Sequence, residues 1–392
     1  MVIKRIILRI IHGLLYFFNI FWYLLNFPIA LLFFSSRNIW LIYEINFDAR
    51  DNGYCFFEYV RKTHPDINVY YVISKKNINY SKANSIGKTI EPYSYKHLLL
   101  FIGANFLLST TIYGLTPNKY LDLFLKKHHL FHAKCVNLNH GIDKDLYESD
   151  FKVRAKRDLI ITGGYPEYLF VLQNYGYDKS EVAYTGLARF DKLHDNIEKD
   201  RILIMPTWRR WIRNSDDITF LTSEYFKKWV EFLESESIAN LHRKGFEIIY
   251  FIHPALNKFI HLFNDISTPV KFCNSKSDDL QELLRSSRIM ITDFSSVFFD
   301  FAYMKKPIIY YQFDEEQFFA THYKKSSYFS YRENGFGPVC TTLEEVQYEL
   351  NRFSHNNFLN DLKYTKRSNE FFILYDCNNC ERIYNAISKL EK

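Results

Sequence analysis

The polar residues best suited to chemistry in this chain lie directly after short apolar runs. His140, Thr207, His253 and the segment 293–296 each follow a run that is apolar and short enough for a buried strand. In open α/β sheets, ligands bind beyond the carboxyl ends of the strands. We therefore expect these side chains to converge on one cleft, where histidine, arginine and hydroxyl groups suit phosphoryl-type transfer.

The stretch 289–311 shows this pattern in its fullest form. Residues 289–291 suit a buried strand, either Ser295 or Ser296 is expected to cap the helix that follows, and Pro307 opens the next strand. A helix start with two hydroxyls and free backbone N–H groups suits a phosphate. An ordinary capped helix of an α/β domain explains the same residues, so this segment alone does not decide between the two.

His140 and a pair of arginines supply the groups that such a transfer needs. Histidine has an unperturbed pKa of about 6.5, so His140 can accept a proton at cellular pH, although a histidine hydrogen-bonded within the structure is the alternative. Arg209 and Arg210 follow a strand that ends at Pro206 and Thr207. A guanidinium binds phosphate through two parallel hydrogen bonds, but a solvated basic loop explains the pair as well.

The segment 292–311 resembles the Asp-aromatic-Ser-Ser-Val signature, with its later Lys-Pro, of the CDP-glycerol glycerophosphotransferase family, the teichoic acid primases and polymerases. Five other blocks resemble those of the family and occur in its order: 137–141 (Asn-Leu-Asn-His-Gly), 185–191 (Thr-Gly-Leu-Ala-Arg-Phe-Asp), 205–209 (Met-Pro-Thr-Trp-Arg), 252–254 (Ile-His-Pro) and 375–383, in which Cys377 stands where glycine is usual. Each block alone is a weak signal, but six blocks in one order are specific.

The resemblance implies roles for individual residues. It makes His140 the general base that activates the acceptor hydroxyl, and it gives His253 a contact with a donor phosphate or the leaving group. Ser295 and Ser296 are expected to hold the β-phosphate or bridging oxygens, and Asp293 to orient the serines or bind a ribose or polyol hydroxyl. The expected donor-binding residues are Thr207, Arg209, Asp293, Ser295, Ser296 and Asp300. For Asp300, a solvated carboxylate on a helix is an equally good explanation.

Two residues are predicted to bind the acceptor. Lys144 follows the His-Gly pair, where the family commonly continues with Thr-Pro-Leu-Lys-Lys and this chain continues with Ile-Asp-Lys-Asp, so the identity of the acceptor is left open. Arg50 lies in the polar turn 47–54, which opens the first long helix, and is expected to bind an acceptor phosphate. Capping of that helix by Asp51 or Asn52 explains the turn equally well.

Composition bounds the class of protein. A chain of 392 residues with 47% hydrophobic residues suits two domains with substantial cores. The net charge of +6 is spread along the chain, which fits an anionic substrate or a membrane surface and not the basic tract of a nucleic-acid-binding protein. Six scattered cysteines are typical of reduced thiols in a cytosolic enzyme.

Neither a metal nor a cofactor is predicted. Cys377 and Cys380 form a lone CxxC, which helix spacing explains as well as zinc or redox chemistry does. The sequence shows no carboxylate pair or histidine cluster with convincing ligand spacing. Arginine, histidine and a helix dipole can supply the positive field that a pyrophosphate needs.

Residues 10–34 form a nearly continuous apolar run. It is preceded by three basic residues: Lys4, Arg5 and Arg9. The run is long enough for a single membrane span of about 20 residues, but the basic residues would then send the rest of the chain outside the cell, away from a nucleotide donor. Pro28 and Asn26 indicate instead an interfacial or re-entrant segment, and a buried core helix is the alternative. We expect peripheral or monotopic association with the cytoplasmic face of the membrane, with the topology left open.

Strands and helices alternate along the rest of the chain, as in parallel sheets. The strands expected from apolar runs are 38–45, 69–73, 106–109, 136–138, 159–161, 182–184, 202–205, 247–252, 270–272, 289–292 and 308–311. We predict an α/β, GT-B-like fold of two doubly wound Rossmann-type domains that face each other across a cleft, with the charged run 198–201 as the linker. The expected domains are a membrane-associating segment at 1–37, an acceptor domain at 38–198, and a CDP-polyol donor domain at 199–392 with a closing helix.

Three functions fit these observations. The first is a membrane-associated transferase that moves glycerol phosphate, or ribitol phosphate, from a CDP-polyol to a hydroxyl of a lipid-linked cell-surface glycopolymer precursor and releases CMP. The second is a GT-B glycosyltransferase that uses a nucleotide sugar in surface polysaccharide synthesis and releases UDP or GDP. The third, an inactive scaffold or lipid-binding protein, is disfavoured by the joint presence of His140, Arg209, His253 and the Ser295-Ser296 turn. Under the first function the partners are the CDP-polyol, the lipid-linked glycan and the membrane surface, without nucleic acid.

Overall fold

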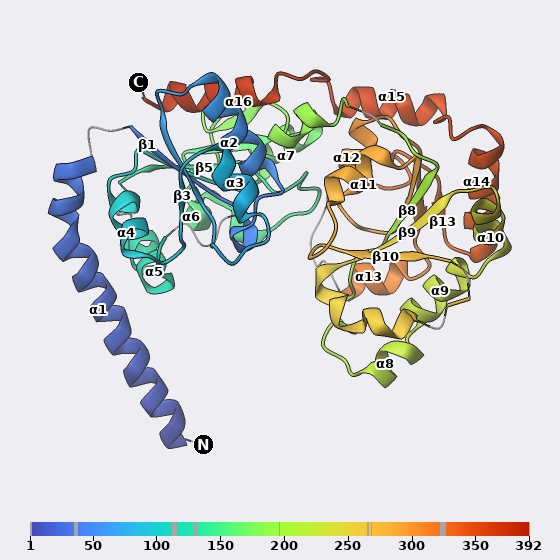
Figure 1. Ribbon diagram of the computed structural model, residues 1–392, viewed down its shortest axis with the longest axis horizontal. Coiled ribbons are helices and arrows are strands. Elements are labelled where there is room, and N and C mark those ends of the chain that lie inside the picture. The colour runs from blue at the N-terminus through green and yellow to red at the C-terminus, as the bar shows by residue number, and fades with distance from the viewer. Residues whose placement is uncertain are drawn as a thin grey trace. The chain divides into compact units, whose positions relative to one another are not determined.

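The computed structural model describes residues 2–34, 38–111, 116–128, 132–195, 197–264, 266–267, 269–321 and 327–391. The chain divides into two compact units, each built around one parallel sheet (Figure 1). Unit 1 comprises Met1–His140, Tyr147–Asp191 and Asp376–Lys392, and unit 2 comprises Gly141–Leu146 and Lys192–Tyr375. The predicted segment 1–37 ends at Arg37, which lies outside the described residues.

Unit 1 contains a seven-stranded parallel sheet in the order β3-β2-β1-β4-β5-β6-β7. Trp40 of β1 lies opposite Val69 of β2 and Phe106 of β4, which fixes the register at the centre of the sheet. The central strands are buried on both faces, and this explains their nearly continuous apolar sequences. The strands are β1 (Ile39–Tyr43), β2 (Asn68–Val72), β3 (Thr89–Ile90), β4 (Phe106–Ser109), β5 (Lys134–Asn137), β6 (Leu159–Thr162) and β7 (Val182–Tyr184).

Alternate residues of each strand of unit 1 pack against helices on opposite faces of the sheet. Trp40 and Ile42 join a core cluster with α2 (Asn52–Thr63) and α16 (Asn379–Ser388). Figure 1 shows α16, in red, beside α2, in blue. Leu41 and its neighbours pack on the other face against helices that include α1 (Val2–Phe34), α4 (Tyr95–Ile102) and α5 (Lys119–His128). The remaining helices of this unit are α3 (Tyr80–Ile86), α6 (Lys152–Ala155) and α7 (Tyr165–Asn174), with 3-10 turns η1 (Ile45–Phe47), η2 (Glu148–Asp150) and η5 (Lys389–Glu391).

Unit 2 contains a six-stranded parallel sheet in the order β10-β9-β8-β11-β12-β13. The strands are β8 (Arg201–Met205), β9 (Glu247–Ile252), β10 (Lys271–Asn274), β11 (Ile289–Thr292), β12 (Ile308–Tyr311) and β13 (Val339–Cys340). The helices that cover it are α8 (Asp217–Thr222), α9 (Glu224–Leu233), α10 (Glu236–Arg243), α11 (Leu280–Ser286), α12 (Phe298–Tyr303), α13 (Glu315–Thr321), α14 (Leu343–His355) and α15 (Leu362–Phe371), with the 3-10 segment η4 (Pro254–Phe263). A further 3-10 turn, η3 (Ala188–Lys192), ends where unit 2 resumes.

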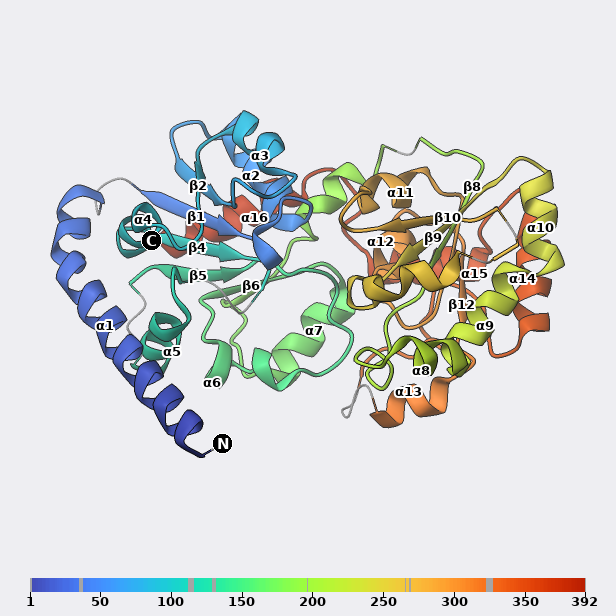
Figure 2. The ribbon, with the colours of Figure 1, turned by 60° about the horizontal axis from the view of Figure 1, so that its bottom comes forward.

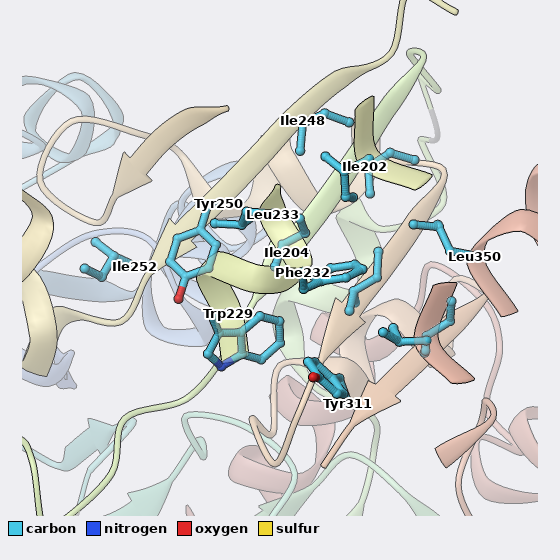
Figure 3. Packing of buried hydrophobic residues seen from close by; sticks show 14 of the residues in the cluster. Ile202, Ile204, Trp229, Phe232, Leu233, Ile248, Tyr250, Ile252, Tyr311 and Leu350 are labelled. Carbon is cyan, nitrogen blue, oxygen red and sulfur yellow. The ribbon is translucent and has the colours of Figure 1, made fainter. Parts of the chain in front are cut away.

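Trp229 of α9 lies at the centre of the core of unit 2 and is fully buried (Figure 3). Its ring centroid is 5.4 Å from that of Tyr311 in β12 and 6.2 Å from that of Tyr250 in β9. Side chains of β8 and α14, such as Ile204 and Leu350, complete the cluster. This core fixes the carboxyl ends of β8 and β9, which carry predicted donor-binding residues.

The predicted strands are confirmed, and the predicted α/β fold of two parallel-sheet units is confirmed with them. Two strands were not predicted, β3 and β13, and each is a two-residue strand at the edge of its sheet. A run that short carries no alternation of apolar and polar residues from which to predict it. The charged run 198–201 lies in unit 2, where Arg201 is already the first residue of β8.

One local prediction is wrong. Helix α12 begins at Phe298, and its N-cap is Val297 without a side-chain hydrogen bond, so neither Ser295 nor Ser296 caps it.

Helix α1 continues through Pro28 without a break. Within α1, Ile11–Phe34 is long and apolar enough to cross a membrane by length and composition, and 17% of its most apolar window is buried.

Candidate active site

His140 follows β5 on a turn that exposes its side chain. The preceding residue, Asn139, has a left-handed backbone with φ of 55°, which asparagine tolerates better than most residues. The Asn139 side chain donates a 2.9 Å hydrogen bond to the carbonyl of Ile161, and its backbone N–H donates to Asn137 Oδ1 at 3.2 Å. The turn is thereby fixed to both β5 and β6, and it leaves the imidazole of His140 67% exposed.

Asp51 orients the imidazole of His140. One oxygen of its carboxylate accepts a short hydrogen bond from Nδ1 of His140, and the other lies 2.7 Å from Nη1 of Arg189. Arg189 also donates to the backbone carbonyl of His140 at 2.6 Å. Because the carboxylate is an acceptor, we assign the proton of the neutral imidazole to Nδ1, which leaves Nε2 as the basic nitrogen.

Glu44 stabilises the turn that carries Asp51. The carboxylate of Glu44 accepts hydrogen bonds from the backbone N–H groups of Arg50 (2.9 Å), Asp51 (3.0 Å) and Tyr54 (2.6 Å). Gly53 is required for this approach, because a Cβ at that position would lie 2.9 Å from Cγ of Glu44. The carboxylate therefore replaces the side-chain cap that the start of α2 lacks.

Asn52 joins the three segments that form this site. Its Nδ2 donates to the carbonyl of Asn139 at 2.7 Å, and its Oδ1 accepts the backbone N–H of Arg189 at 3.0 Å. Asn52 is fully buried. The turns that carry Asp51, His140 and Arg189 are thus held together by one amide side chain.

The charges of this cluster shift the pKa values of its members in opposite directions. The Asp51 carboxylate raises the pKa of His140, although burial opposes the shift. Burial raises the pKa of Asp51, but His140 and Arg189 outweigh it, so the net shift is downward. Burial and then the nearby Asp51 raise the pKa of Glu44 to about 8, against the three backbone N–H groups that favour its charged form. These surroundings make His140 more basic than an isolated histidine.

The two predicted acceptor-binding residues lie in different units. Arg50 belongs to unit 1, where its Nε is 3.3 Å from Asp48 Oδ2. Lys144 belongs to unit 2, where it is buried and its Nζ is 2.5 Å from Asp145 Oδ2. Its ammonium also lies 5.6 Å from the ring centre of Tyr331. In this structure Lys144 has a carboxylate and an aromatic ring as partners instead of solvent.

A cavity of about 550 Å³ in unit 2 lies beyond the carboxyl ends of β8 and β9. His253 lines it, and its Nδ1 accepts the backbone N–H of Ala255 at 3.1 Å at the start of η4. Burial, and then the charge of Arg213, lower the pKa of His253 to about 4. The imidazole is therefore neutral at cellular pH, and its Nε2 carries the proton and can donate to an anion. The other lining residues are Trp208, Arg213, Asn214, Pro254, Ala255 and Lys258.

Arg209 lies under this site and is not exposed to it. The guanidinium is fully buried, with Nη1 2.8 Å from Asp293 Oδ2 and Nε 2.6 Å from Asp314 Oδ2. Three aromatic rings surround the guanidinium, and their centres lie 5.0 Å (Tyr225), 5.2 Å (Phe294) and 4.9 Å (Phe318) from its central carbon. Arg213, four residues further on, is exposed and stacks at 5.0 Å on the ring of Trp208 at the cavity.

Thr207 and Asp293 belong to the same buried network as Arg209. The backbone N–H of Thr207 donates to Asp293 Oδ1 at 2.8 Å, and the carbonyl of Thr207 accepts from Arg209 at 3.0 Å. Burial raises the pKa of Asp293, and Arg209 opposes this shift. The network ties the turn after β8 to the turn after β11, so these residues position the surfaces that a ligand would meet.

The remaining predicted residues lie around the turn after β11. Ser295 is largely buried and Ser296 is exposed. Asp300 is buried on α12, where it accepts a 3.4 Å hydrogen bond from Gln281 Nε2. It is therefore not the solvated helix carboxylate that the sequence left open.

Sequence reasoning missed several residues of both units. Arg189 stood inside the quoted block 185–191, and Asp51 stood in the turn 47–54, but each was assigned no role at the site. The role of Glu44 could not be predicted, because a carboxylate that accepts hydrogen bonds from backbone N–H groups leaves no characteristic residue spacing in the sequence. The exposed cavity residues Arg213 and Lys258 gave no signal either, since Arg213 lies in a turn and Lys258 in a 3-10 segment whose side-chain directions the sequence does not show.

Comparison with protein families decides the assignment. The model of the family described as CDP-Glycerol:Poly(glycerophosphate) glycerophosphotransferase matches residues 25–389. The chain belongs to this family. The resemblance seen in the six sequence blocks is thereby confirmed, and members of the family are transferases.

Curated relatives of the chain act in teichoic acid synthesis. The minor teichoic acid biosynthesis protein GgaB of Bacillus subtilis (strain 168) is 32% identical over 91% of this chain and 40% of its own length. The teichoic acid poly(glycerol phosphate) polymerase of the same organism is 23% identical over 87% of this chain and 47% of its own length. The chain therefore spans less than half the length of these two relatives.

Solved structures share the fold. The wall teichoic acid polymerase TagF superposes with a TM-score of 0.66 and 16% identity, over 96% of this chain and 98% of that chain. A TagF variant soaked with CDPG gives a TM-score of 0.67 at 15% identity, over 96% and 98% of the two chains. The UDP-GlcNAc 2-epimerase of Neisseria meningitidis bound to UDP-GlcNAc superposes with a TM-score of 0.50 and 12% identity, over 90% of this chain and 99% of that chain. These likenesses establish the GT-B-like fold and no activity.

Proposed function

We propose that this chain transfers glycerol phosphate, or ribitol phosphate, from a CDP-polyol to a hydroxyl of a lipid-linked cell-surface glycopolymer precursor, with release of CMP. The observation that carries the proposal is the Asp51-His140 pair, in which a carboxylate orients an exposed imidazole and makes it more basic. A hydroxyl nucleophile needs such a base. Membership of the family supplies the substrate class.

The chemical step follows from the basic nitrogen of His140. The acceptor O–H gives its proton to Nε2, and its oxygen forms a bond to the phosphorus that carries the polyol. The bond from that phosphorus to the oxygen shared with CMP breaks, and CMP leaves with the bonding electron pair. Asp51 stabilises the imidazolium that forms, because its carboxylate faces Nδ1. His140 then returns the proton to solvent.

The donor is proposed to bind at the cavity of unit 2. His253 donates from Nε2, and the exposed Arg213 and Lys258 supply the positive charge that a pyrophosphate requires. Ser295 and Ser296, in the turn after β11, are proposed to contact the phosphates. We propose that the other predicted donor-binding residues support this site from the interior of unit 2: Thr207, Arg209, Asp293 and Asp300. Arg209 and Asp293 have this role because they form an ion pair with each other in the buried network.

The acceptor is proposed to be bound by residues around His140. Arg50 lies in the turn that also carries Asp51, so a phosphate of the acceptor at Arg50 would bring its hydroxyl near the base. Lys144 follows His140 closely in the chain, but its buried pairing with Asp145 favours a supporting role for it.

Helix α1 is proposed to hold the protein on the cytoplasmic face of the membrane as a monotopic, in-plane helix. It is fixed along unit 1 by two polar contacts, Asn118 to Asn19 Oδ1 at 2.8 Å and Tyr95 to Asn26 Oδ1 at 2.7 Å. Figure 2 shows α1 running beside α4 and α5. Its opposite face exposes large apolar side chains: Leu14, Phe17, Phe18, Phe21, Leu24, Leu25, Leu32 and Phe33. An apolar face of this kind enters the interfacial region of a bilayer.

Vesicle flotation tests this placement. Phe17 and Leu32 are 72% and 81% exposed, so a Phe17→Asp, Leu32→Asp double variant should fold and lose vesicle binding by at least tenfold. Leu362→Asp is the matched control, because Leu362 is 87% exposed on α15 of unit 2. Equal binding by the double variant and the wild type would contradict the proposed anchor.

Nucleotide release tests the activity. Purified protein in detergent is given CDP-glycerol, CDP-ribitol or UDP-sugars with a lipid-linked disaccharide acceptor. We expect CMP from a CDP-polyol only when the acceptor is present, and loss of CMP release in His140→Ala by a factor of about 10² to 10⁴, the usual contribution of general acid-base catalysis. Release of UDP from a sugar donor, without CMP from either CDP-polyol, would support the glycosyltransferase alternative instead.

A further inference from the structure

Another cavity, of about 670 Å³, lies in unit 1 between α6 and the carboxyl end of α7. Its walls combine basic and aromatic side chains, chiefly Lys152, Lys156 and Arg157 with Phe151 and Tyr175. Its volume is in the range of small-molecule sites. None of these residues takes part in the site around His140 or in the donor cavity.

Arg157 is the feature of this cavity that points to a ligand. Its side chain lines the cavity although the residue is only 3% exposed. Its Nη2 donates to the carbonyl of Thr111 at 3.1 Å, but its buried Nε has no hydrogen-bond partner among the described residues. Buried polar groups in native structures almost always have partners, so an unfilled guanidinium donor at a cavity wall calls for an acceptor from outside the chain.

The carboxylates around the cavity already have cationic or backbone partners. Asp158 accepts the backbone N–H of Cys135 at 2.8 Å and lies 3.1 Å from Lys134 Nζ. Burial raises the pKa of Asp150 to about 6, against the attraction of Arg157. At the rim, Lys152 Nζ lies 2.7 Å from Glu181 and 3.3 Å from Asp178. The cavity wall therefore offers a positive charge to an anion.

The aromatic wall suits the carbon skeleton of a polyol. The rings of Phe151 and Tyr175 pack edge to face with centroids 5.4 Å apart. Gly176 also lines the cavity, with φ of 77° and nothing within 4 Å of the position of a Cβ, so space remains open there. A charged guanidinium beside an apolar wall matches a phosphate ester whose alcohol is a short polyol.

We propose that this cavity binds a polyol-phosphate ester of the acceptor, apart from the hydroxyl that reacts at His140. The proposal rests on the function proposed above, because that function supplies an acceptor built of polyol phosphates. The same chemistry occurs in the headgroup of phosphatidylglycerol, a lipid of anionic membranes. The test therefore includes a soluble source and a membrane source of the same group.

Two variants and one control test the cavity. Arg157→Gln removes the unfilled donor, and Val153→Glu places a negative charge at the cavity wall without disturbing the fold, because Val153 is 78% exposed. Lys62→Glu is the control, since Lys62 is exposed on α2 away from the cavity. Binding of a soluble glycerol phosphate oligomer is measured by titration calorimetry, binding to phosphatidylglycerol vesicles by flotation, and the KM for the lipid-linked acceptor by CMP release.

Loss of at least tenfold in oligomer affinity in both cavity variants, with a matching rise in acceptor KM and unchanged kcat, is the expected result. A loss confined to vesicle binding would also support a phosphate-ester site and would identify its source as the lipid headgroup. The proposal is overturned if the wild type binds neither probe, or if Val153→Glu and Lys62→Glu behave alike with both. The binding readouts do not need turnover, so the absence of CMP release from the wild type would count against the proposed function and not against this cavity.

Discussion

Replacing Asp51 by asparagine removes the carboxylate that orients His140 while keeping the size of the side chain. A hydrogen bond to a charged group contributes about 1.5–3 kcal/mol. The imidazole is 67% exposed, so water screens the pair and the lower end of that range applies. Since about 1.4 kcal/mol is a factor of ten in rate, we expect kcat for CMP release to fall about tenfold in Asp51→Asn.

The pH profile of the same variant gives a second readout. Asp51 raises the pKa of His140, so its removal lowers that pKa. A general base works in its neutral form, and the acidic limb of the kcat/KM profile should therefore move to lower pH while the plateau falls. Asp66→Asn is the control, because Asp66 is exposed in the loop after α2. An acidic limb and a plateau equal to those of the wild type would refute the assignment of His140 as a base oriented by Asp51.

The stability of Asp51→Asn should depend on pH as well. The lowered pKa of Asp51 contributes stability that is present above its unfolded value of about 3.9 and lost as pH falls through the folded value. The raised pKa of His140 contributes stability below about 6.5 that is lost as pH rises through its folded value. The loss of melting temperature in the variant should therefore be larger at about pH 5 than at pH 9, where only the Arg189 partner remains.

Four further substitutions test unit 2. Arg209→Met should lower the melting temperature sharply, because it leaves buried carboxylates without their cation at a cost of about 3–5 kcal/mol. Arg213→Ala should instead raise the KM for the CDP-polyol with little change in melting temperature. The pKa of His253 is lowered to about 4, so the stability that its neutral form contributes is present above about pH 6.5 and is lost as pH falls toward 4. His253→Asn should therefore lose less stability than the wild type between about pH 6.5 and 4, as measured by denaturation at a series of pH values. Trp229→Ala should cost about 3–5 kcal/mol and lower the melting temperature by roughly 10 °C in calorimetry, since the indole is fully buried at the centre of its core.

Much of the fold was predictable because the strands of a parallel sheet are buried on both faces. Strands such as Ile289–Thr292 and Ile308–Tyr311 are buried at every position and consist mostly of apolar residues, and each is bounded by polar or proline residues. The two-residue edge strands carry no such pattern. The predicted cap at Ser295 or Ser296 failed because the chain makes an extra turn before α12, and the order of residues alone does not reveal that turn.

The chemistry of single residues was less predictable than their position. Arg209 stands in a family block and was expected to bind phosphate, but burial between Asp293 and Asp314 gives it carboxylate partners, and a sequence does not show which arginine after a strand turns inward. His140 was predicted because it follows a short apolar run and stands in a block that resembles the family's His-Gly block. Its orienting partner Asp51 lies 89 positions away in sequence, and only the fold brings the two together.

The mass of the acceptor after incubation with a CDP-polyol is the most direct test of polyol phosphate transfer by this chain. A synthetic lipid-linked disaccharide, protein and CDP-glycerol or CDP-ribitol are incubated together, and the acceptor is analysed by mass spectrometry beside a reaction with His140→Ala. We expect an acceptor heavier by one or more polyol phosphate units with the wild type and an unchanged acceptor with the variant. An acceptor that stays unchanged with both CDP-polyols, or that gains a sugar from a nucleotide sugar instead, would contradict this expectation.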